Sequence, residues 1–272
     1  MAVPTIEIAS GVHIPQIGLG LWKVKDETQF AEGFQSAIDA GYRHFDTAQI
    51  YGNETMLGSA WKASGLPREE LFITTKIWLK NYGQRHLQKS LEASLKNLQT
   101  EYVDLLLLHF PVTVLRRKAW KILEELVQGD TVKAIGVSNY TVRHLEEMKK
   151  YATITPAVNQ VELHVFLQQP ELVEYCRQEG IKIEAYSPLA HGKVMDDPTI
   201  TEIAEKHGKS YARIMLRWCI EQDAVVLAKS ITPSRIIENL QLFDFAFDDE
   251  DKAALQTLDR DLRTCWSPVH VP

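Results

Sequence analysis

The sequence predicts an α/β fold, a single (β/α)₈ barrel domain over residues 1–272. Two observations indicate it: eight short apolar runs alternate with stretches of helical periodicity, and no linker or change of composition interrupts the alternation. The length of 272 residues and the 45% share of hydrophobic residues suit an undivided domain with a substantial core.

The predicted elements follow one another in a regular order. A hairpin comes first, with strands 5–8 and 12–15 on either side of a Ser10-Gly11 turn. Barrel strands are expected at 17–20, 44–46, 71–76, 103–109, 134–137, 157–161, 183–186 and 225–227. Helical periodicity occupies intervals such as 27–40, 86–98 and 142–149, and Gly41 ends the first of these helices. Two extra helices are expected between the last two strands, at 200–206 and 211–221, and another at 249–258 before an irregular tail.

A doubly wound open sheet is the alternative fold. That fold predicts a G-x-G-x-x-G fingerprint after the first strand, where the glycines let the backbone approach a dinucleotide. The chain has no such fingerprint, since the nearest match stops at Gly18-Leu19-Gly20. The pattern therefore favours the closed barrel.

Composition excludes several classes of protein. The longest apolar run, 105–108, is far shorter than the roughly 18 residues of a membrane span, and residues 1–10 lack the features of a signal peptide. Three cysteines without Cys-x-x-Cys spacing disfavour a disulfide framework and a thiolate zinc site. The formal net charge of −6 argues against a general nucleic-acid binder. A cytoplasmic protein without membrane or nucleic-acid partners is expected.

Polar or aromatic residues end nearly every predicted strand, and the carboxyl ends of the strands are where a barrel carries its chemistry. These residues are Asp46, Lys76, His109, Ser138-Asn139, Asn159-Gln160, Tyr186-Ser187 and Lys229-Ser230. None of them is specific alone, because a lysine at a strand end can lie on the surface and a lone histidine is usually packed in the core. Seven such ends together indicate a site.

Three of these side chains, together with the nearby Tyr51, suit the protonation of a carbonyl oxygen. Asp46 and Lys76 come from adjacent strands, so an ion pair between them is expected. An ammonium close to the nearby Tyr51 favours the phenolate, and we expect it to lower the tyrosine pKa from about 10. Tyr51 can then donate a proton at neutral pH, while an uncharged His109 holds the substrate oxygen as a hydrogen-bond donor.

Five segments spaced along the chain carry a family resemblance. They are Asp46-Thr47-Ala48-Gln49-Ile50-Tyr51-Gly52-Asn53-Glu54, Thr75-Lys76, His109, Gly136-Val137-Ser138-Asn139 and Lys229-Ser230-Ile231-Thr232-Pro233-Ser234-Arg235-Ile236-Ile237-Glu238-Asn239. These segments resemble the signatures of the aldo-keto reductases, and the resemblance covers essentially the whole chain. Within that family the chain looks most like the short bacterial branch that includes 2,5-diketo-D-gluconate and methylglyoxal reductases.

The resemblance implies a role for each matching residue. Tyr51 is the expected general acid, tuned by Lys76 and Asp46, and His109 is expected to orient the carbonyl. For the nicotinamide end of the cofactor, the resemblance implies binding by Ser138, Asn139, Gln160 and a stacked Tyr186. It implies that Ser187 and Leu189 line the pyrophosphate. It also implies that Lys229, Ser230 and Arg235 surround the ribose 2′-phosphate and that Glu238 and Asn239 contact the adenine.

The charges near the last strand favour NADPH over NADH. Lys229 and Arg235 supply a local positive site on an acidic protein, and an arginine can bind a phosphate through two parallel hydrogen bonds. A 2′-phosphate is the group that distinguishes NADPH from NADH, so the expected cofactor is NADPH.

The chain departs from the family pattern around the expected pocket. Phe110 stands where a tryptophan is usual, and Ala228 replaces a common proline. His191 stands near the expected pyrophosphate, where a small or differently polar residue is frequent. The 111–120 segment and the tail are short, which leaves the shape of the pocket and the substrate open. Trp22 and Trp78 are expected as aromatic pocket walls, with ordinary packing at the barrel rim as the alternative.

Three other functions are compatible with parts of this pattern. A metal hydrolase could use His44, Asp46 and His109, but Lys76 would repel a divalent cation, and no metal is expected. A Schiff-base lyase would need Lys76 as a neutral amine, which Asp46 opposes. A nucleotide-binding redox sensor or regulatory subunit could keep every residue named.

The prediction is an NADPH-dependent carbonyl reductase that acts on a small aldehyde or ketone. No appended domain or heptad pattern indicates an obligatory protein partner, so a monomer is expected.

Overall fold

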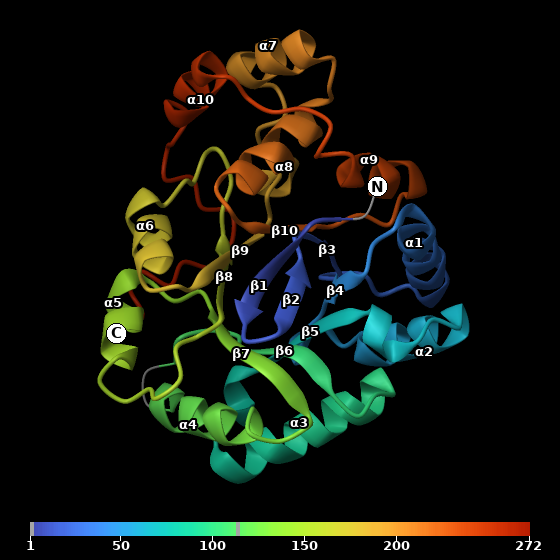
Figure 1. Cartoon of the computed structure of the whole chain (residues 1–272), viewed down its shortest axis with the longest axis vertical. Coiled ribbons are helices and arrows are strands. Elements are labelled where there is room, and N and C mark those ends of the chain that lie inside the picture. The colour runs from blue at the N-terminus through green and yellow to red at the C-terminus, as the bar shows by residue number, and fades with distance from the viewer. Residues whose placement is uncertain (1–2, 113–114) are drawn as a thin grey trace.

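The computed structural model describes residues 3–112 and 115–272 and confirms the predicted barrel (Figure 1). Eight strands pair in parallel in the order β10-β3-β4-β5-β6-β7-β8-β9, and the first and last of this order pair to close the barrel. The strands are β3 (Ile17–Gly20), β4 (His44–Asp46), β5 (Phe72–Ile77), β6 (Val103–Leu108), β7 (Val132–Ser138), β8 (Val158–Glu162), β9 (Lys182–Tyr186) and β10 (Val225–Ala228).

Each barrel strand lies within two residues of its predicted bounds. The prediction succeeds because parallel barrel strands are covered on both faces and therefore read as nearly continuous apolar runs. The burial patterns agree, since every residue of β3, β4, β5, β6, β8 and β10 is buried.

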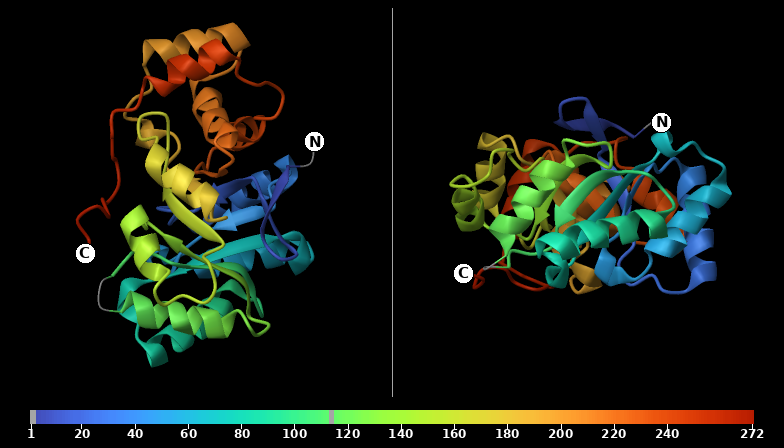
Figure 2. Two further views of the ribbon diagram at one scale, coloured as in Figure 1. Left: turned by 60° about the vertical axis from the view of Figure 1, so that its left-hand side comes forward. Right: turned by 90° about the horizontal axis from the view of Figure 1, so that it is seen from below.

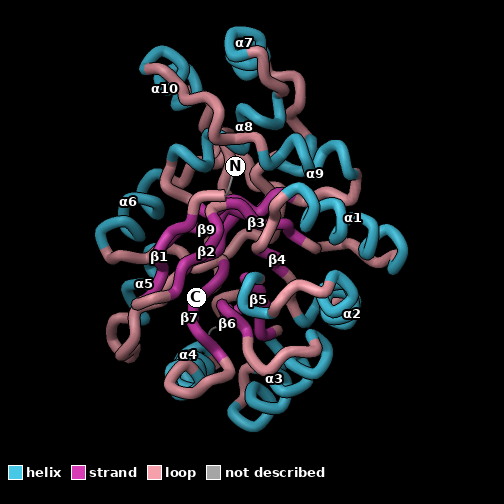
Figure 3. Tube along the Cα trace, turned by 45° about the vertical axis from the view of Figure 1, so that its right-hand side comes forward, coloured by secondary structure: helices cyan, strands magenta, loops and turns pink. Residues whose placement is uncertain are grey.

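Helices surround the strands, as Figure 3 shows. They are α1 (Glu27–Ala40), α2 (Glu54–Ser64), α3 (Gln84–Leu98), α4 (Arg116–Leu126), α5 (Val142–Met148), α6 (Pro170–Gln178), α7 (Pro198–His207), α8 (Tyr211–Glu221), α9 (Pro233–Leu240) and α10 (Asp249–Gln256). The extra helices predicted between the last two strands are α7 and α8. α1 begins after Asp26, whose side chain accepts a 2.8 Å hydrogen bond from the backbone of Gln29, and it ends at Gly41 with φ 108°.

The N-terminal hairpin covers one end of the barrel (Figure 2). Its strands are β1 (Thr5–Ala9) and β2 (Val12–Pro15), which pair antiparallel. Ile8 and Ile14 are buried in a second core cluster with the barrel residues Phe72, Leu105, Leu107, Ala134, Ala157, Val158 and Val225. This end of the barrel is therefore closed by apolar side chains, which leaves the carboxyl ends of the strands open for chemistry.

Small residues make room for a polar layer inside the barrel. A Cβ atom on Gly18 of β3 would come within 2.5 Å of Nδ1 of His44, so only a glycine at this position leaves space for the imidazole. His44, Asp46, Lys76 and Glu184 are all buried charged or polar side chains of neighbouring strands. A polar cluster thus lies in the barrel interior, beyond the apolar side chains that close the hairpin end.

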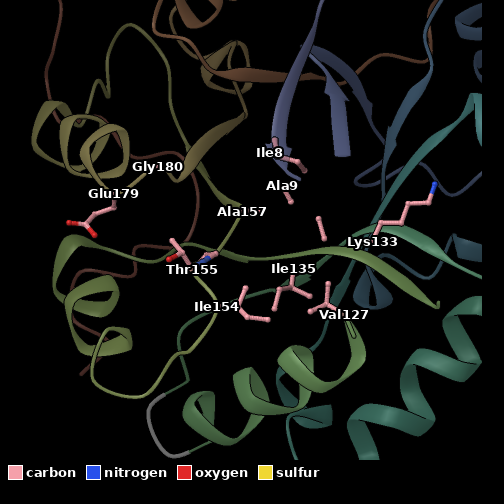
Figure 4. A pocket seen from close by; sticks show the side chains of 12 residues that line it. Ile8, Ala9, Val127, Lys133, Ile135, Ile154, Thr155, Ala157, Glu179 and Gly180 are labelled. Atoms are coloured by element: carbon pink, nitrogen blue, oxygen red, sulfur yellow. The ribbon is translucent and has the colours of Figure 1, made fainter. Parts of the chain in front are cut away.

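A cavity of about 240 Å³ lies beside the hairpin, away from the carboxyl ends of the strands (Figure 4). Ile8, Ala9, Lys133, Thr155 and Ala157 are among the residues that line it, and they belong to the hairpin or to the starts of β7 and β8. Within the described parts of the chain, no helix is both long and apolar enough to cross a membrane.

Candidate active site

A buried ion pair forms the centre of the site. Lys76 Nζ lies 2.6 Å and 2.7 Å from the two carboxylate oxygens of Asp46, and it also donates to the carbonyl oxygen of Thr47 at 2.9 Å. The two side chains come from adjacent strands, as expected, and are fully or almost fully buried. Burial alone lowers the pKa of Lys76, but Asp46 and Tyr51 raise it above its usual value, so the side chain is an ammonium.

Tyr51 reaches this pair from the short 3₁₀ helix Gln49–Tyr51, which follows β4. Its hydroxyl lies 3.4 Å from Lys76 Nζ, and its ring is edge-on to His109 with the ring centres 5.8 Å apart. The structure therefore brings Asp46, Tyr51, Lys76 and His109 together, as the sequence predicted.

The expected direction of the Tyr51 pKa was wrong. Loss of water around the phenol raises the tyrosine pKa, and the nearby Lys76 offsets only part of that effect. The reason is that an enclosed phenolate loses its hydration, a cost that sequence reasoning did not include. Tyr51 is consequently protonated at neutral pH, which is the state that a proton donor needs.

His109 directly follows β6 and carries no charge. Burial, followed by the field of Lys76, holds its pKa well below 6.5. Its Nδ1 is buried and has no hydrogen-bond partner among residues 3–112 and 115–272. The backbone carbonyl of His109 accepts a 3.1 Å bond from Asn139, which joins this residue to the next group of side chains.

A second group of polar side chains lies beside His109 and its neighbours. Asn139 Nδ2 donates to Ser138 Oγ at 3.0 Å, and Asn139 Oδ1 accepts from the Tyr186 hydroxyl at 2.6 Å. The Gln160 backbone carbonyl accepts hydrogen bonds from Ser138 Oγ and from the backbone N–H of Asn139, both at 2.9 Å. Four of the predicted cofactor residues thus form one connected group next to His109.

The loop after β9 has an unusual backbone. Ser187, Ala190 and His191 all have positive φ angles, of 51°, 48° and 56°. His191 Nε2 lies 2.9 Å from Ser187 Oγ and 3.1 Å from Cys265 Sγ, so the tail is held against this loop. Leu189 is half-buried in the same loop. Sequence analysis placed His191 near the pyrophosphate but missed its contact with the tail.

The residues predicted to surround a 2′-phosphate lie at the end of β10 and on α9. Lys229 and Arg235 are exposed, and neither forms an ion pair with any described residue. Ser230 is buried, and its hydroxyl accepts a 3.1 Å bond from the backbone of Thr232. On α9, Glu238 is half-buried and Asn239 is only 4% exposed. Both cations thus lie on the short stretch of chain from the end of β10 into α9.

Aromatic rings line the mouth above the ion pair. Trp78 is edge-on to His109, with the ring centres 5.2 Å apart, and its ring centre lies 6.2 Å from that of Trp266 in the tail. The ring of Phe110 is edge-on to that of Trp266, with the ring centres 6.5 Å apart. Trp22 is edge-on to His191, with the ring centres 5.3 Å apart. Sequence analysis named Trp22 and Trp78 but missed Trp266, which is 65% exposed. Its irregular tail carries no pattern that marks a pocket residue.

Near the Asp46–Lys76 ion pair lies a carboxyl group that sequence analysis also missed. Glu184 of β9 is fully buried, and burial, followed by the charge of Asp46, raises its pKa to about 8. His44 Nε2 lies 3.4 Å from Glu184 Oε1, and burial lowers the pKa of His44 to about 3. Both groups are therefore neutral at pH 7.

Comparison with known proteins decides the family. Residues 16–260 match the model of the aldo/keto reductase family. The chain is 44% identical to the glyoxal reductase of Bacillus subtilis over 264 residues, which cover 97% of this chain and 96% of that protein. This chain belongs to the aldo/keto reductase family.

A second bacterial relative of this aldo-keto reductase agrees with the expected branch, and a solved structure agrees with the family. It is 42% identical to the methylglyoxal reductase DkgA of Salmonella typhimurium, with 97% of this chain and 96% of that protein covered. Its fold matches a Bombyx mori aldo-keto reductase solved in complex with NADP, with a TM-score of 0.90, 32% identity, and coverage of 97% and 95% of the two chains. The resemblance on which the sequence prediction relied is therefore confirmed.

The site of this aldo-keto reductase also bears on the other functions weighed. Lys76 is an ammonium and not the neutral amine that a Schiff-base lyase needs, because the negative charge of Asp46 raises the pKa of Lys76. No cluster of three His, Cys, Asp or Glu side chains that could hold a metal ion is found among the described residues. His44 instead lies against Thr74 and Glu184, at 3.2 Å and 3.4 Å.

The buried Glu184 predicts a pH dependence of stability. Its pKa is higher in the folded protein than the unfolded value of about 4.3, so the folded state holds the extra proton between about pH 4.3 and 8. Stability therefore falls as pH rises through this window, by at most about 1.4 kcal/mol per pH unit. The lowered pKa of His44 makes stability rise with pH between about pH 3 and 6.5, which is the opposite direction.

The Glu184→Gln variant isolates this effect, because His44, Asp46 and Lys76, the titratable groups around Glu184, are retained. We expect the urea midpoint of the wild type to fall relative to that of the variant from pH 6.5 to 8. Parallel curves over that range would contradict the raised pKa.

Proposed function

We propose that the protein reduces aldehydes or ketones to alcohols with NADPH and that Tyr51 is the general acid. As an aldo-keto reductase the protein is an NADPH-dependent oxidoreductase, and the proposal adds the roles of its residues. The observation that carries it is the hydroxyl of a protonated Tyr51 at 3.4 Å from a buried ammonium and beside a neutral histidine.

The side chains present fit NADPH. Lys229 and Arg235 are exposed cations without ion pairs to described residues, as a 2′-phosphate requires. Ser138, Asn139 and Gln160 form the connected polar group suited to an amide ligand, and Tyr186 supplies a ring next to it. Ser187 and Leu189 are assigned to the pyrophosphate, and Ser230, Glu238 and Asn239 to the 2′-phosphate and adenine. When bound, NADPH supplies a hydride.

The chain's own residues then protonate the substrate. The Tyr51 hydroxyl donates its proton to the carbonyl oxygen as negative charge develops there. Lys76 stabilises the phenolate that remains, and Asp46 keeps Lys76 in place and charged. His109, which is neutral, donates a hydrogen bond to the same oxygen and orients it.

The substrate class follows from the mouth of the site. Trp78 lies against His109, and Trp266 lies next to both Trp78 and Phe110. With Trp22 beside His191, these rings supply the aromatic surface that suits the apolar part of a small carbonyl compound. The related glyoxal and methylglyoxal reductases are named for small dicarbonyl compounds, which supports the same class. We assign the activity to the cytoplasm, a location that three free cysteines support.

Oxidation of NADPH, followed by absorbance, tests the proposal. The panel contains methylglyoxal, an aromatic aldehyde, an aldose and a diketo sugar acid. Turnover of at least one carbonyl compound is expected. Tight NADPH binding without turnover of any of them would contradict the proposal and favour the redox sensor.

The cation pair near α9 predicts a preference for NADPH. Replacing Lys229 with alanine is expected to lower kcat/KM for NADPH about tenfold or more and to change kcat/KM for NADH by no more than about twofold. The reason is that a charge-assisted hydrogen bond to phosphate contributes about 1.5–3 kcal/mol. The measurement is kcat/KM for each cofactor. Lys118→Ala, at an exposed lysine of α4, is the matched control. Equal losses for the two cofactors would place the 2′-phosphate elsewhere.

A further inference from the structure

The proposed mechanism leaves one buried acidic group without a role. Glu184 is 0% exposed and lies on β9, where it pairs in register with Gln160 of β8. The side-chain nitrogen of Gln160 donates to Glu184 Oε2 at 2.7 Å and to Asp46 Oδ2 at 2.8 Å. Gln160 thus joins the catalytic ion pair to Glu184.

These two bonds determine which way the Gln160 amide faces. An amide nitrogen carries two hydrogens, and each of them has a carboxyl oxygen as its acceptor here. Turning the amide over would place its oxygen against the Asp46 carboxylate, an acceptor against an acceptor. The carbonyl oxygen Oε1 is left over, and no residue of the described ranges donates to it.

Gln160 also lies next to the residues assigned to the nicotinamide carboxamide. Its backbone carbonyl accepts from Ser138 Oγ and from the Asn139 amide, both at 2.9 Å. The Gln160 side chain therefore lies between the catalytic ion pair and the cofactor side of the site. A free carbonyl oxygen at this place can accept a hydrogen bond from an amide NH₂ group of a ligand.

We propose that Glu184 is a positioning residue: with Asp46 it accepts both amide hydrogens of Gln160 and so keeps Gln160 Oε1 directed to accept from the NH₂ of the cofactor carboxamide. This inference rests on the proposed function, which assigns the carboxamide to Ser138, Asn139 and Gln160. Asp46 alone would occupy one of the two hydrogens. The other would lack an acceptor inside the barrel, and the amide, held by a single bond to Asp46, could tilt about that bond and move Oε1 away from the carboxamide.

The charge of the cluster is compatible with this role. Burial and the nearby Asp46 raise the pKa of Glu184 to about 8, so it is neutral at pH 7. The groups that face it are His44, Asp46 and Lys76, and His44 is also neutral. A neutral Glu184 still offers Oε2 as an acceptor, and it does not compete with Asp46 for the Lys76 ammonium.

The test compares two ligands that differ only at the carboxamide. NADP⁺ carries the NH₂ group, whereas its 3-acetylpyridine analogue has a methyl group in that place. Replacing Glu184 with methionine keeps the length of the side chain and removes the acceptor. We expect Glu184→Met to bind NADP⁺ about 3- to 10-fold more weakly and to bind the analogue as the wild type does, with Kd measured by quenching of tryptophan fluorescence.

Two further variants separate positioning from general stability. Glu184→Gln retains an acceptor oxygen and is expected to keep the wild-type Kd for NADP⁺ within about twofold. Asp104→Asn is the matched control, because Asp104 is a buried carboxylate at the other end of a barrel strand, where it accepts from the Ile73 backbone and from Arg68. It is expected to lower the urea midpoint and leave both Kd values unchanged.

Each outcome decides the matter. If Glu184→Met loses affinity equally for NADP⁺ and for the analogue, or loses it for neither, the positioning role is overturned. The proposed function stands in that case, provided that the wild type reduces carbonyl compounds. A wild type that binds neither ligand overturns the proposed function itself. Glu184→Leu, which also lacks an acceptor, replaces the methionine variant if that variant does not fold.

Discussion

Replacing Tyr51 with phenylalanine is expected to lower kcat for carbonyl reduction by about 10²- to 10⁴-fold, the usual contribution of a general acid. The phenyl ring fills the same space, but it has no proton to give to the developing alkoxide. The affinity for NADPH is expected to stay within about twofold, because the residues assigned to the cofactor come from other parts of the chain, from the ends of β7 to β10 and from α9. Steady-state kinetics and fluorescence quenching measure the two quantities.

A matched control for this variant is Tyr175→Phe. The Tyr175 hydroxyl donates to Glu146 on the protein surface, at 2.6 Å, so its loss should leave kcat unchanged. If Tyr51→Phe keeps the wild-type kcat, another group protonates the substrate. If it loses NADPH binding as well as turnover, Tyr51 acts through the cofactor site.

Replacing Lys76 with methionine is expected to destabilise the protein by about 3–5 kcal/mol and to abolish most of the activity. The variant leaves the Asp46 carboxylate buried without a positive partner, which is a large cost in a closed barrel. It also removes the ammonium that stabilises the Tyr51 phenolate. Urea unfolding and kcat measure the two effects.

The double variant Lys76→Met/Asp46→Asn separates stability from catalysis. An asparagine cannot carry the unpaired charge, so the double variant is expected to regain part of the lost stability and none of the activity. A single Lys76→Met variant as stable as the wild type would show that Asp46 takes up a proton at little cost. Recovery of activity in the double variant would remove Lys76 from the mechanism.

The strands and the grouping of Asp46, Tyr51, Lys76 and His109 could be predicted from the sequence because their signals are local. A fully buried parallel strand is a short apolar run, and the residue that ends it is visible as a break in that run, as with Asp46 and Lys76. Closure of the barrel then brings the ends of distant strands to one face, so the residues did not need to be close in sequence. The resemblance to aldo-keto reductases supplied the remaining roles.

Contacts made by the tail could not be predicted in this way. Trp266 reaches Trp78 and Phe110, and Cys265 lies 3.1 Å from His191, across separations of more than 70 residues. The tail has no periodicity that would indicate which surface it covers. Its path depends on packing against the finished barrel.

The sequence by itself determined the order of strands and helices, the polar strand ends and the family, because each depends on residue type and spacing. Only the tertiary structure decided the state of the groups inside the barrel. The pKa of Tyr51 rises instead of falling because burial outweighs the nearby ammonium, and Glu184 holds a proton because the closed barrel removes it from water beside Asp46. Hydration and the distances between charges exist only once the chain has folded, and they set which of these groups can give or hold a proton.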